Sequence, residues 1–192
     1  MVAHRTDATD RVLVLVLLTV PSTPRKVVDR EAARVLLVDG AGRVLLFEGL
    51  DPADRDGGSW WFTPGGGLEG EESAEQAAHR ELWEETGLRV PRLAGPVAER
   101  RSEFAFDGLL YRQHELYFAA ALEATDVVVG PVAHTELEVR SVLRWHWWSA
   151  DELARTQERV YPPWLARWLA RTVTEGLTNR YPDEAAPVRD DA

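Results

Sequence analysis

Short apolar runs, separated by glycine-containing polar turns, dominate the first half of the chain. Residues 34–38 (RVLLV) and 43–47 (RVLLF) are two such runs, and residues 39–42 (DGAG) separate them. Runs of this length that flank a glycine-containing turn are typical of a β-hairpin. We therefore predict a hairpin here, followed by a polar, glycine-rich loop at 51–59 and a short strand at 60–62 (WWF).

A helical pattern begins after residue 73. Residues 74–86 contain neither Gly nor Pro and are rich in Ala, Glu, Leu and Arg, which is a composition that favours a helix. Ser73 is a good N-cap residue, and Gln76 three positions later completes a capping box. Gly87 suits the left-handed position that ends a helix. This segment is the clearest helix that the sequence predicts.

The second half again mixes strands and helices. Apolar and aromatic stretches predict three more strands, at 97–106, 110–122 and 139–148. A turn at residues 107–108 (DG) separates the first two of them. Ser149 suits the N-cap of a second helix, the prolines at 162–163 break it, and a third helix is expected at 164–175. Mixed strands with a few helices indicate an α+β fold with α/β/α layers.

The chain length is sufficient for one domain with a sizeable core. We expect this domain at residues 30–180, an N-terminal extension at 1–29 and a C-terminal tail at 181–192. The longest apolar run covers residues 12–18, and to residue 20 if Thr19 is included. It is far shorter than the roughly 20 residues of a membrane span. It also lacks the small-x-small cleavage site of a secretion signal. We therefore expect no membrane partner and a cytoplasmic location.

Composition narrows the functional classes. Cysteine is absent, which excludes disulfides and cysteine-based zinc sites. The chain has 22 basic and 32 acidic residues, giving a net charge of −10. Extended binding to nucleic acid needs basic patches that release counterions, so a nucleic-acid partner is not expected. A small phosphorylated substrate stays compatible with this charge when metal ions supply positive charge.

The segment 66–88 (GGLEGEESAEQAAHRELWEETGL) carries the candidate chemistry. Seven of its residues define the pattern: Gly66, Glu72, Arg80, Glu81, Glu84, Glu85 and Gly87. On a helix, the spacing i, i+3 and i+4 places Glu81, Glu84 and Glu85 on one face. Three like charges destabilise a bare helix, and a hard cation with oxygen ligands offsets that repulsion. The spacing predicts a Mg²⁺ or Mn²⁺ site; a solvated acidic helix face is the alternative.

This segment resembles the Nudix box, whose pattern is G-x5-E-x7-R-E-U-x-E-E-x-G-U with U aliphatic, and every defined position matches. The resemblance implies a Nudix-type α/β/α sandwich with a mixed β-sheet. It also implies a Mg²⁺-dependent (or Mn²⁺-dependent) pyrophosphohydrolase. Such an enzyme cleaves the diphosphate bond of a nucleoside diphosphate linked to another moiety X. Downstream signatures of the ADP-sugar, dinucleoside polyphosphate and NADH subfamilies are absent, so the sequence does not name X.

The resemblance assigns roles to residues of this chain. Candidate metal ligands are Glu81, Glu84 and Glu85, with Glu72 as an occasional ligand and the Gly65 carbonyl as a further one. Gly66 lets the loop backbone approach a ligand closely. Arg80 is expected to hold a box glutamate in place and to lie at the substrate site. The general base is a box acid, Glu84 or Glu85, or an acid from a later loop, for which Glu136 is the candidate.

Residues outside the box are expected to select the substrate. Phe104, Phe106 and Tyr111 are candidates for stacking on a nucleobase, and a core role is the alternative for aromatic residues at strand spacing. Glu103 and Glu115 are weaker candidates for the general base. His114 is a candidate for substrate contact, although a strand histidine is more often structural.

Two other classes share this fold. A non-catalytic sensor would keep the nucleotide-binding fold but is expected to lose box acids, whereas this chain keeps all four. An isopentenyl diphosphate isomerase normally needs a catalytic cysteine, which is absent. A homodimer is a candidate assembly, because Trp-rich segments can support one where they are exposed. The alternative is that the eight tryptophans fill the core.

Overall fold

The computed structural model describes residues 26–125, 127–133 and 135–177. The expected C-terminal tail (181–192), the apolar run at 12–18 and most of the expected N-terminal extension (1–29) lie outside these residues. The elements in chain order are β1 (Val27–Val38), β2 (Val44–Asp51), β3 (Asp54–Phe62), β4 (Gly65–Gly67), α1 (Ala74–Thr86), β5 (Ala94–Phe106), β6 (Leu109–Ala121), α2 (Glu136–Ser141), β7 (Val142–Trp148), α3 (Ala150–Arg155), β8 (Val160–Tyr161) and α4 (Leu165–Glu175).

The strands form one mixed sheet. Its order is β5-β6-β1-β2-β3-β8, while β4 pairs with β1 and β7 pairs with β2. Strand β1 runs parallel to β6 along its whole length, from Val27 opposite Leu110 to Val38 opposite Ala121. This long pairing explains why β1 begins well before its apolar run. Strands β5 and β6 form an antiparallel hairpin around the expected turn at residues 107–108.

The predicted hairpin of β1 and β2 is confirmed by the antiparallel pairing at Val38 and Val44. The prediction of a loop over residues 51–59 was wrong, since most of this segment belongs to β3. Trp60 and Ser59 lie opposite Gly49 and Leu50 of β2. Polar and glycine residues have low strand propensity, but pairing with a neighbouring strand outweighs that propensity.

Helix α1 follows the sequence prediction closely. Ser73 is its N-cap and forms the capping box with Gln76, and Gly87 ends it with a left-handed φ of 72°. The predicted strand at 139–148 starts later, because residues 136–141 form the short helix α2, whose own capping box joins Thr135 and Glu138. Helix α3 begins after its predicted cap Ser149 but already ends at Arg155, so the prolines at 162–163 do not break it as predicted.

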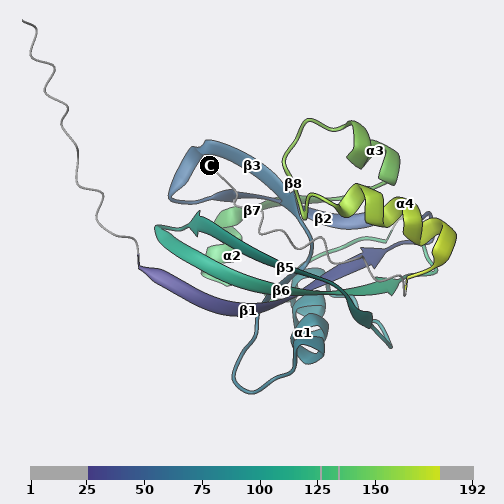
Figure 1. Cartoon of the computed structure of the whole chain (residues 1–192), viewed down its shortest axis with the longest axis horizontal. Helices are drawn as coiled ribbons and strands as arrows, with labels where there is room; N and C mark the ends of the chain where they lie inside the picture. The colour runs from purple at the N-terminus through teal and green to yellow at the C-terminus, as the bar shows by residue number, and fades with distance from the viewer. Residues whose placement is uncertain (1–25, 126, 134, 178–192) are drawn as a thin grey trace, which may run out of the picture.

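Helices cover both faces of the sheet, as the prediction of α/β/α layers requires. In Figure 1, α1 lies on one side of the sheet, and α3 and α4 lie on the other. Leu82 of α1 packs in one core cluster with Val35 and Leu37 of β1. Trp168 of α4 belongs to a second cluster that includes Leu36. Alternate residues of β1 therefore enter two cores, which explains why its apolar run is continuous.

No helix among the described residues has both the length and the apolar character that crossing a membrane requires.

Candidate active site

The glycine loop after β3 is held against β1. Within it, β4 pairs antiparallel with β1, so that Gly65 lies opposite Arg34 and Gly66 lies opposite Ala33. Gly65 has a φ of +129°, and a Cβ atom there would lie 2.1 Å from the carbonyl oxygen of Ala33. Only glycine fits this position, because both the backbone conformation and the close strand contact exclude a side chain.

Three carboxylates meet beside this loop. Glu81, Glu85 and Glu138 each offer an oxygen, and these three atoms lie within 4.8 Å of one another. Glu81 and Glu85 come from one face of α1 and are 7% and 5% exposed, while Glu138 comes from α2 and is half-buried. The box helix thus supplies two of these acids, and an element that starts 50 residues after α1 ends supplies the third.

The buried acids of this cluster are electrostatically costly. Burial raises the pKa of Glu85 well above its ordinary value, and the nearby charge of Glu81 adds to the increase. Burial also raises the pKa of Glu81, although the hydrogen bond and charge of Arg80 act in the opposite direction. Each shift records that the ionised carboxylate is disfavoured where it lies. A bound cation would remove this cost.

The guanidinium of Arg80 binds three of the four box acids. It donates hydrogen bonds to Glu72 at 2.6 Å, to Glu81 at 2.9 Å and to Glu84 at 3.1 Å. It also donates to the carbonyl oxygen of Gly67 at 3.0 Å. Arg80 therefore links the loop, the segment before α1 and the acidic face of α1. Its contacts fix the orientation of Glu81 within the cluster.

The glycine loop contacts the two buried acids directly. The backbone N–H of Gly65 donates to Oε2 of Glu85 at 2.7 Å, and the Gly65 carbonyl accepts from Arg34. A Cβ atom on Gly66 would lie 2.3 Å from Oε1 of Glu81. The absence of a side chain at Gly66 thus leaves the space that the Glu81 carboxylate occupies.

Comparison with known sequences decides the family. The sequence profile of the NUDIX domain matches residues 28–171, which is most of the chain. The chain belongs to the Nudix family. The matched region contains the three clustered acids, the glycine loop and Arg80, so the Nudix box of this chain lies in its expected fold.

Curated relatives agree with this Nudix membership. The RNA pyrophosphohydrolase of Erythrobacter litoralis (strain HTCC2594) is 31% identical over 137 residues, covering 66% of this chain and 79% of that protein. The RNA pyrophosphohydrolase of Novosphingobium aromaticivorans is 34% identical over 137 residues, covering 65% of this chain and 80% of that protein. These matches support a Nudix-type pyrophosphohydrolase, an enzyme that acts on phosphoanhydride bonds.

A solved structure supports the fold independently. The MutT protein of Methanosarcina mazei Go1 has a TM-score of 0.52 and 18% identity, with coverage of 80% of this chain and 100% of that chain. At this identity the likeness concerns the fold alone. It confirms the expected Nudix-type α+β sandwich.

Glu136 and Glu138 have different surroundings in this Nudix domain. Glu136 is the first residue of α2 and is exposed, and it does not belong to the group of three carboxylates. Side chains two positions apart on a helix point about 200° away from each other. Glu138 therefore faces the cluster and Glu136 does not. The capping-box pattern of Thr135 and Glu138 is the sequence signal that could have indicated a helix here.

The candidate stacking residues lie on the hairpin β5–β6 and contact one another. Phe104 and Tyr111 are cross-strand partners whose rings stack with centroids 5.6 Å apart and an angle of 18° between their planes. The guanidinium of Arg30 lies 4.9 Å from the Tyr111 ring. Phe106 contacts Trp60 of β3 edge-on at 6.3 Å. These rings are all partly exposed, and their stacking on a base stays a prediction.

The weaker sequence candidates are engaged in ion pairs or hydrogen bonds. Glu103 pairs with Arg112 at 2.8 Å on the surface. His114 lies 2.8 Å from a carboxylate oxygen of Glu31. Glu115 is buried on β6. Its burial raises the pKa, but the charges of two arginines outweigh burial and leave the pKa of Glu115 below its ordinary value. Glu115 is thus an ionised, fully paired carboxylate, which is a poor general base.

Proposed function

We propose that this chain is a Mg²⁺-dependent hydrolase that cleaves the diphosphate bond of a nucleoside diphosphate linked to another moiety X. The observation that carries the proposal is the convergence of Glu81, Glu85 and Glu138 beside the glycine loop. Carboxylate oxygens are the ligands that Mg²⁺ and Mn²⁺ prefer. Two of the acids are buried and have raised pKa values, which is the state expected of acids built to share a cation.

The donor set fits a divalent ion. In the proposal, Glu81 and Glu85 hold it, and Glu138 lies beside it. Glu84, the chain neighbour of Glu85, and the carbonyl of Gly65, whose N–H donates to Glu85, are further candidate ligands. Glu72 acts through its hydrogen bonds to Arg80. A bound divalent ion would neutralise phosphate oxygens and orient the attacking water.

The chain's own residues complete the proposed reaction. Arg80 keeps Glu81 oriented and presents positive charge next to the site. We assign the general base to Glu138, because its carboxylate lies in the cluster and accepts from neither Arg80 nor the Gly65 N–H, whereas Glu81 accepts from the first and Glu85 from the second. Its Oε2 accepts from the backbone and the hydroxyl of Thr135 at 2.6 Å and 2.8 Å. These bonds orient the carboxylate, and its second oxygen can take the proton of the attacking water.

The 5′ end of an RNA is a second candidate substrate. The relatives from Erythrobacter litoralis and Novosphingobium aromaticivorans favour it through their names. The chemistry would be the same, since a 5′-polyphosphate also contains phosphoanhydride bonds. The net charge of −10 favours the smaller substrate, because an extended RNA brings many phosphates to a negatively charged surface.

A substrate panel tests the proposal. The full chain is incubated with Mg²⁺ and, in parallel, with EDTA, using nucleoside diphosphate derivatives, nucleoside triphosphates and a short 5′-triphosphorylated RNA. We expect phosphate or nucleotide release that requires Mg²⁺ and that the Glu85→Gln variant does not support. Tight nucleotide binding without hydrolysis of any substrate would instead support the non-catalytic sensor.

The proposed homodimer would use an exposed edge. Strand β7 presents Leu143 and Trp145, which are 52% and 37% exposed, next to the strongly exposed Val139 of α2. Sedimentation velocity of the full chain tests this assembly. A dimer that Leu143→Glu dissociates would support it, and a monomer at all concentrations would contradict it.

A further inference from the structure

A buried polar network lies beneath the glycine loop. At its centre, Glu115 of β6 has a side chain that is only 4% exposed. Its carboxylate accepts hydrogen bonds from Arg34 at 3.1 Å, Arg100 at 3.0 Å, Gln113 at 2.7 Å and the Tyr117 hydroxyl at 2.9 Å. The network joins the neighbouring strands β1, β6 and β5. The side chains of this network are largely buried, and the proposed reaction gives them no role.

Arg34 connects this network to the glycine loop. Its Nε donates to Glu115, and its Nη1 donates to the carbonyl oxygens of Gly65 and, at 3.5 Å, Thr63. The N–H of Gly65 in turn donates to Glu85 at 2.7 Å. An unbroken series of hydrogen bonds therefore runs from Glu115 through Arg34 and Gly65 to a carboxylate of the proposed metal site.

Stability alone is a weak reason for this arrangement. A buried ion pair between neighbouring strands contributes little net stability, because desolvation offsets most of the attraction. Arginine is suited to the connection, since its planar guanidinium can donate to an acid on one edge and to a carbonyl on another. Gly65 needs such a partner because it has a φ of +129° and no side chain to hold it.

We propose that Arg34, held in place by Glu115, is a positioning residue that fixes Gly65 and thereby the Glu85 carboxylate for cation binding. The inference rests on the proposed metal site and adds to it a residue outside the Nudix box. Groups that orient metal ligands typically change metal affinity by about 10–100-fold when they are substituted.

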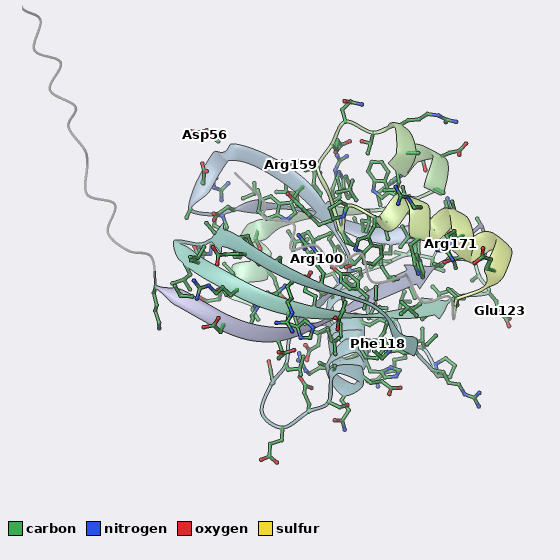
Figure 2. All side chains as sticks on the ribbon, in the orientation of Figure 1. Asp56, Arg100, Phe118, Glu123, Arg159 and Arg171 are labelled. Atoms are coloured by element: carbon green, nitrogen blue, oxygen red, sulfur yellow. The ribbon has the colours of Figure 1, made fainter. Side chains whose placement is uncertain are left out.

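The network offers a matched control. Arg34 and Arg100 both donate to Glu115, through opposite oxygens, and both side chains are largely buried, at 13% and 9% exposure. Figure 2 labels Arg100 near the middle of the molecule, on β5. Arg34→Lys and Arg100→Lys each leave Glu115 with one arginine. The two variants therefore disturb the same ion pair network, but only the first removes a hydrogen bond to the Gly65 carbonyl.

Electron paramagnetic resonance measures Mn²⁺ binding to the full-length parent and to both variants, without nucleotide. The melting temperature of each protein is measured as well. We expect Arg34→Lys to weaken Mn²⁺ binding by about 10–100-fold and Arg100→Lys to change it by less than about threefold, at similar losses of melting temperature. Equal effects of the two variants on Mn²⁺ binding, or no effect of either, would overturn the inference and leave the network a structural one.

Two further results keep the outcome clear. If Arg34→Lys does not fold, Arg34→Gln replaces it, because Gln is neutral and leaves Glu115 paired with Arg100. The same weakening of Mn²⁺ binding is then expected. A parent protein that binds no Mn²⁺ would contradict the proposed metal site itself. A parent that binds Mn²⁺ with unchanged Arg34 variants would contradict this inference alone.

Discussion

Glu81 and Glu85 are nearly inaccessible to solvent, yet both bear groups that are most stable when ionised and hydrated. Their surroundings compensate only in part. Arg80 contacts Glu81 at 2.9 Å, and Glu85 receives one backbone hydrogen bond. Carboxylates whose pKa values are perturbed by burial and by a specific charged neighbour cluster at functional sites. Single substitutions next to these two acids should therefore change metal binding or activity more than they change packing.

Gly66 is expected to be essential for this geometry. In Gly66→Ala, the new Cβ would lie 2.3 Å from Oε1 of Glu81, so the carboxylate must move out of the cluster. We expect kcat/KM to fall by about 10–100-fold and the Mg²⁺ concentration that gives half-maximal activity to rise. Gly67→Ala is the control, since its nearest neighbour would lie 3.8 Å away and neither glycine has a positive φ. Steady-state kinetics that show equal activities for both variants would contradict this account of Gly66.

Glu138 and Glu136 separate two assignments of the general base. Glu138→Gln is expected to lower kcat by about 100–10,000-fold, because the proton acceptor is lost. The helix should persist, since Gln also completes a capping box. Glu136→Gln should retain activity within about twofold, because Glu136 is exposed and lies outside the cluster. The reverse pattern in single-turnover measurements would restore Glu136 as the base.

At the scale of elements, α1 combines a strong helix signal with a destabilising acidic face. Its capping box, its left-handed Gly87 and its buried Leu82 favour the helix. Its buried acids oppose that stability whenever no cation is bound. The helix is thus stable enough to carry a charge arrangement that serves binding rather than folding.

This conflict predicts a gain of stability in Glu85→Gln. The raised pKa of Glu85 means that the folded state binds more protons than the unfolded state above about pH 4.3. The parent's free energy of unfolding therefore decreases as pH rises from that value through the folded-state pKa. In EDTA at about pH 8, we expect Glu85→Gln to be more stable than the parent by about 1–3 kcal/mol. Denaturant unfolding at about pH 5 should show a smaller difference; an equal difference at both pH values would contradict the prediction.

At the scale of the whole molecule, the net charge of −10 bears on the choice of substrate. A long polyanion is repelled at low ionic strength, where the Debye length is about 30 Å, and much less at about 0.15 M salt, where it is about 8 Å. A mononucleotide with the same phosphate chain carries fewer charges and is repelled less. We therefore expect the surface to disfavour longer polyanionic substrates, and we expect salt to weaken that preference.

Salt dependence consequently separates the two candidate substrates. We expect kcat/KM for a 5′-triphosphorylated RNA of about 20 nucleotides to lie below that for a small nucleotide at low salt. The gap should narrow as salt rises to about 0.15 M. Should the RNA instead be the better substrate at low salt and lose its advantage as salt increases, an RNA 5′ end would be the preferred substrate.

Much of the fold was predictable because the signals are local. The turn at residues 39–42 and the caps of α1 are each read from a few adjacent residues. The strand at 60–62 was predicted, but its extension back to Asp54 was not predictable, since these polar residues join the strand through pairing with β2. The early start of β1 at Val27 depends in the same way on pairing with β6, whose partner residues are more than 80 positions away.

The sequence by itself determined the Nudix box, with Glu81 and Glu85 on one face of α1 next to a glycine loop, because helical spacing alone places those acids together. Only the tertiary structure decided that Glu138 completes the group and that Arg34 connects Glu115 to Gly65. These contacts join strands and helices that are distant in the chain. Their geometry follows from sheet order and helix packing, which no local pattern of residues encodes.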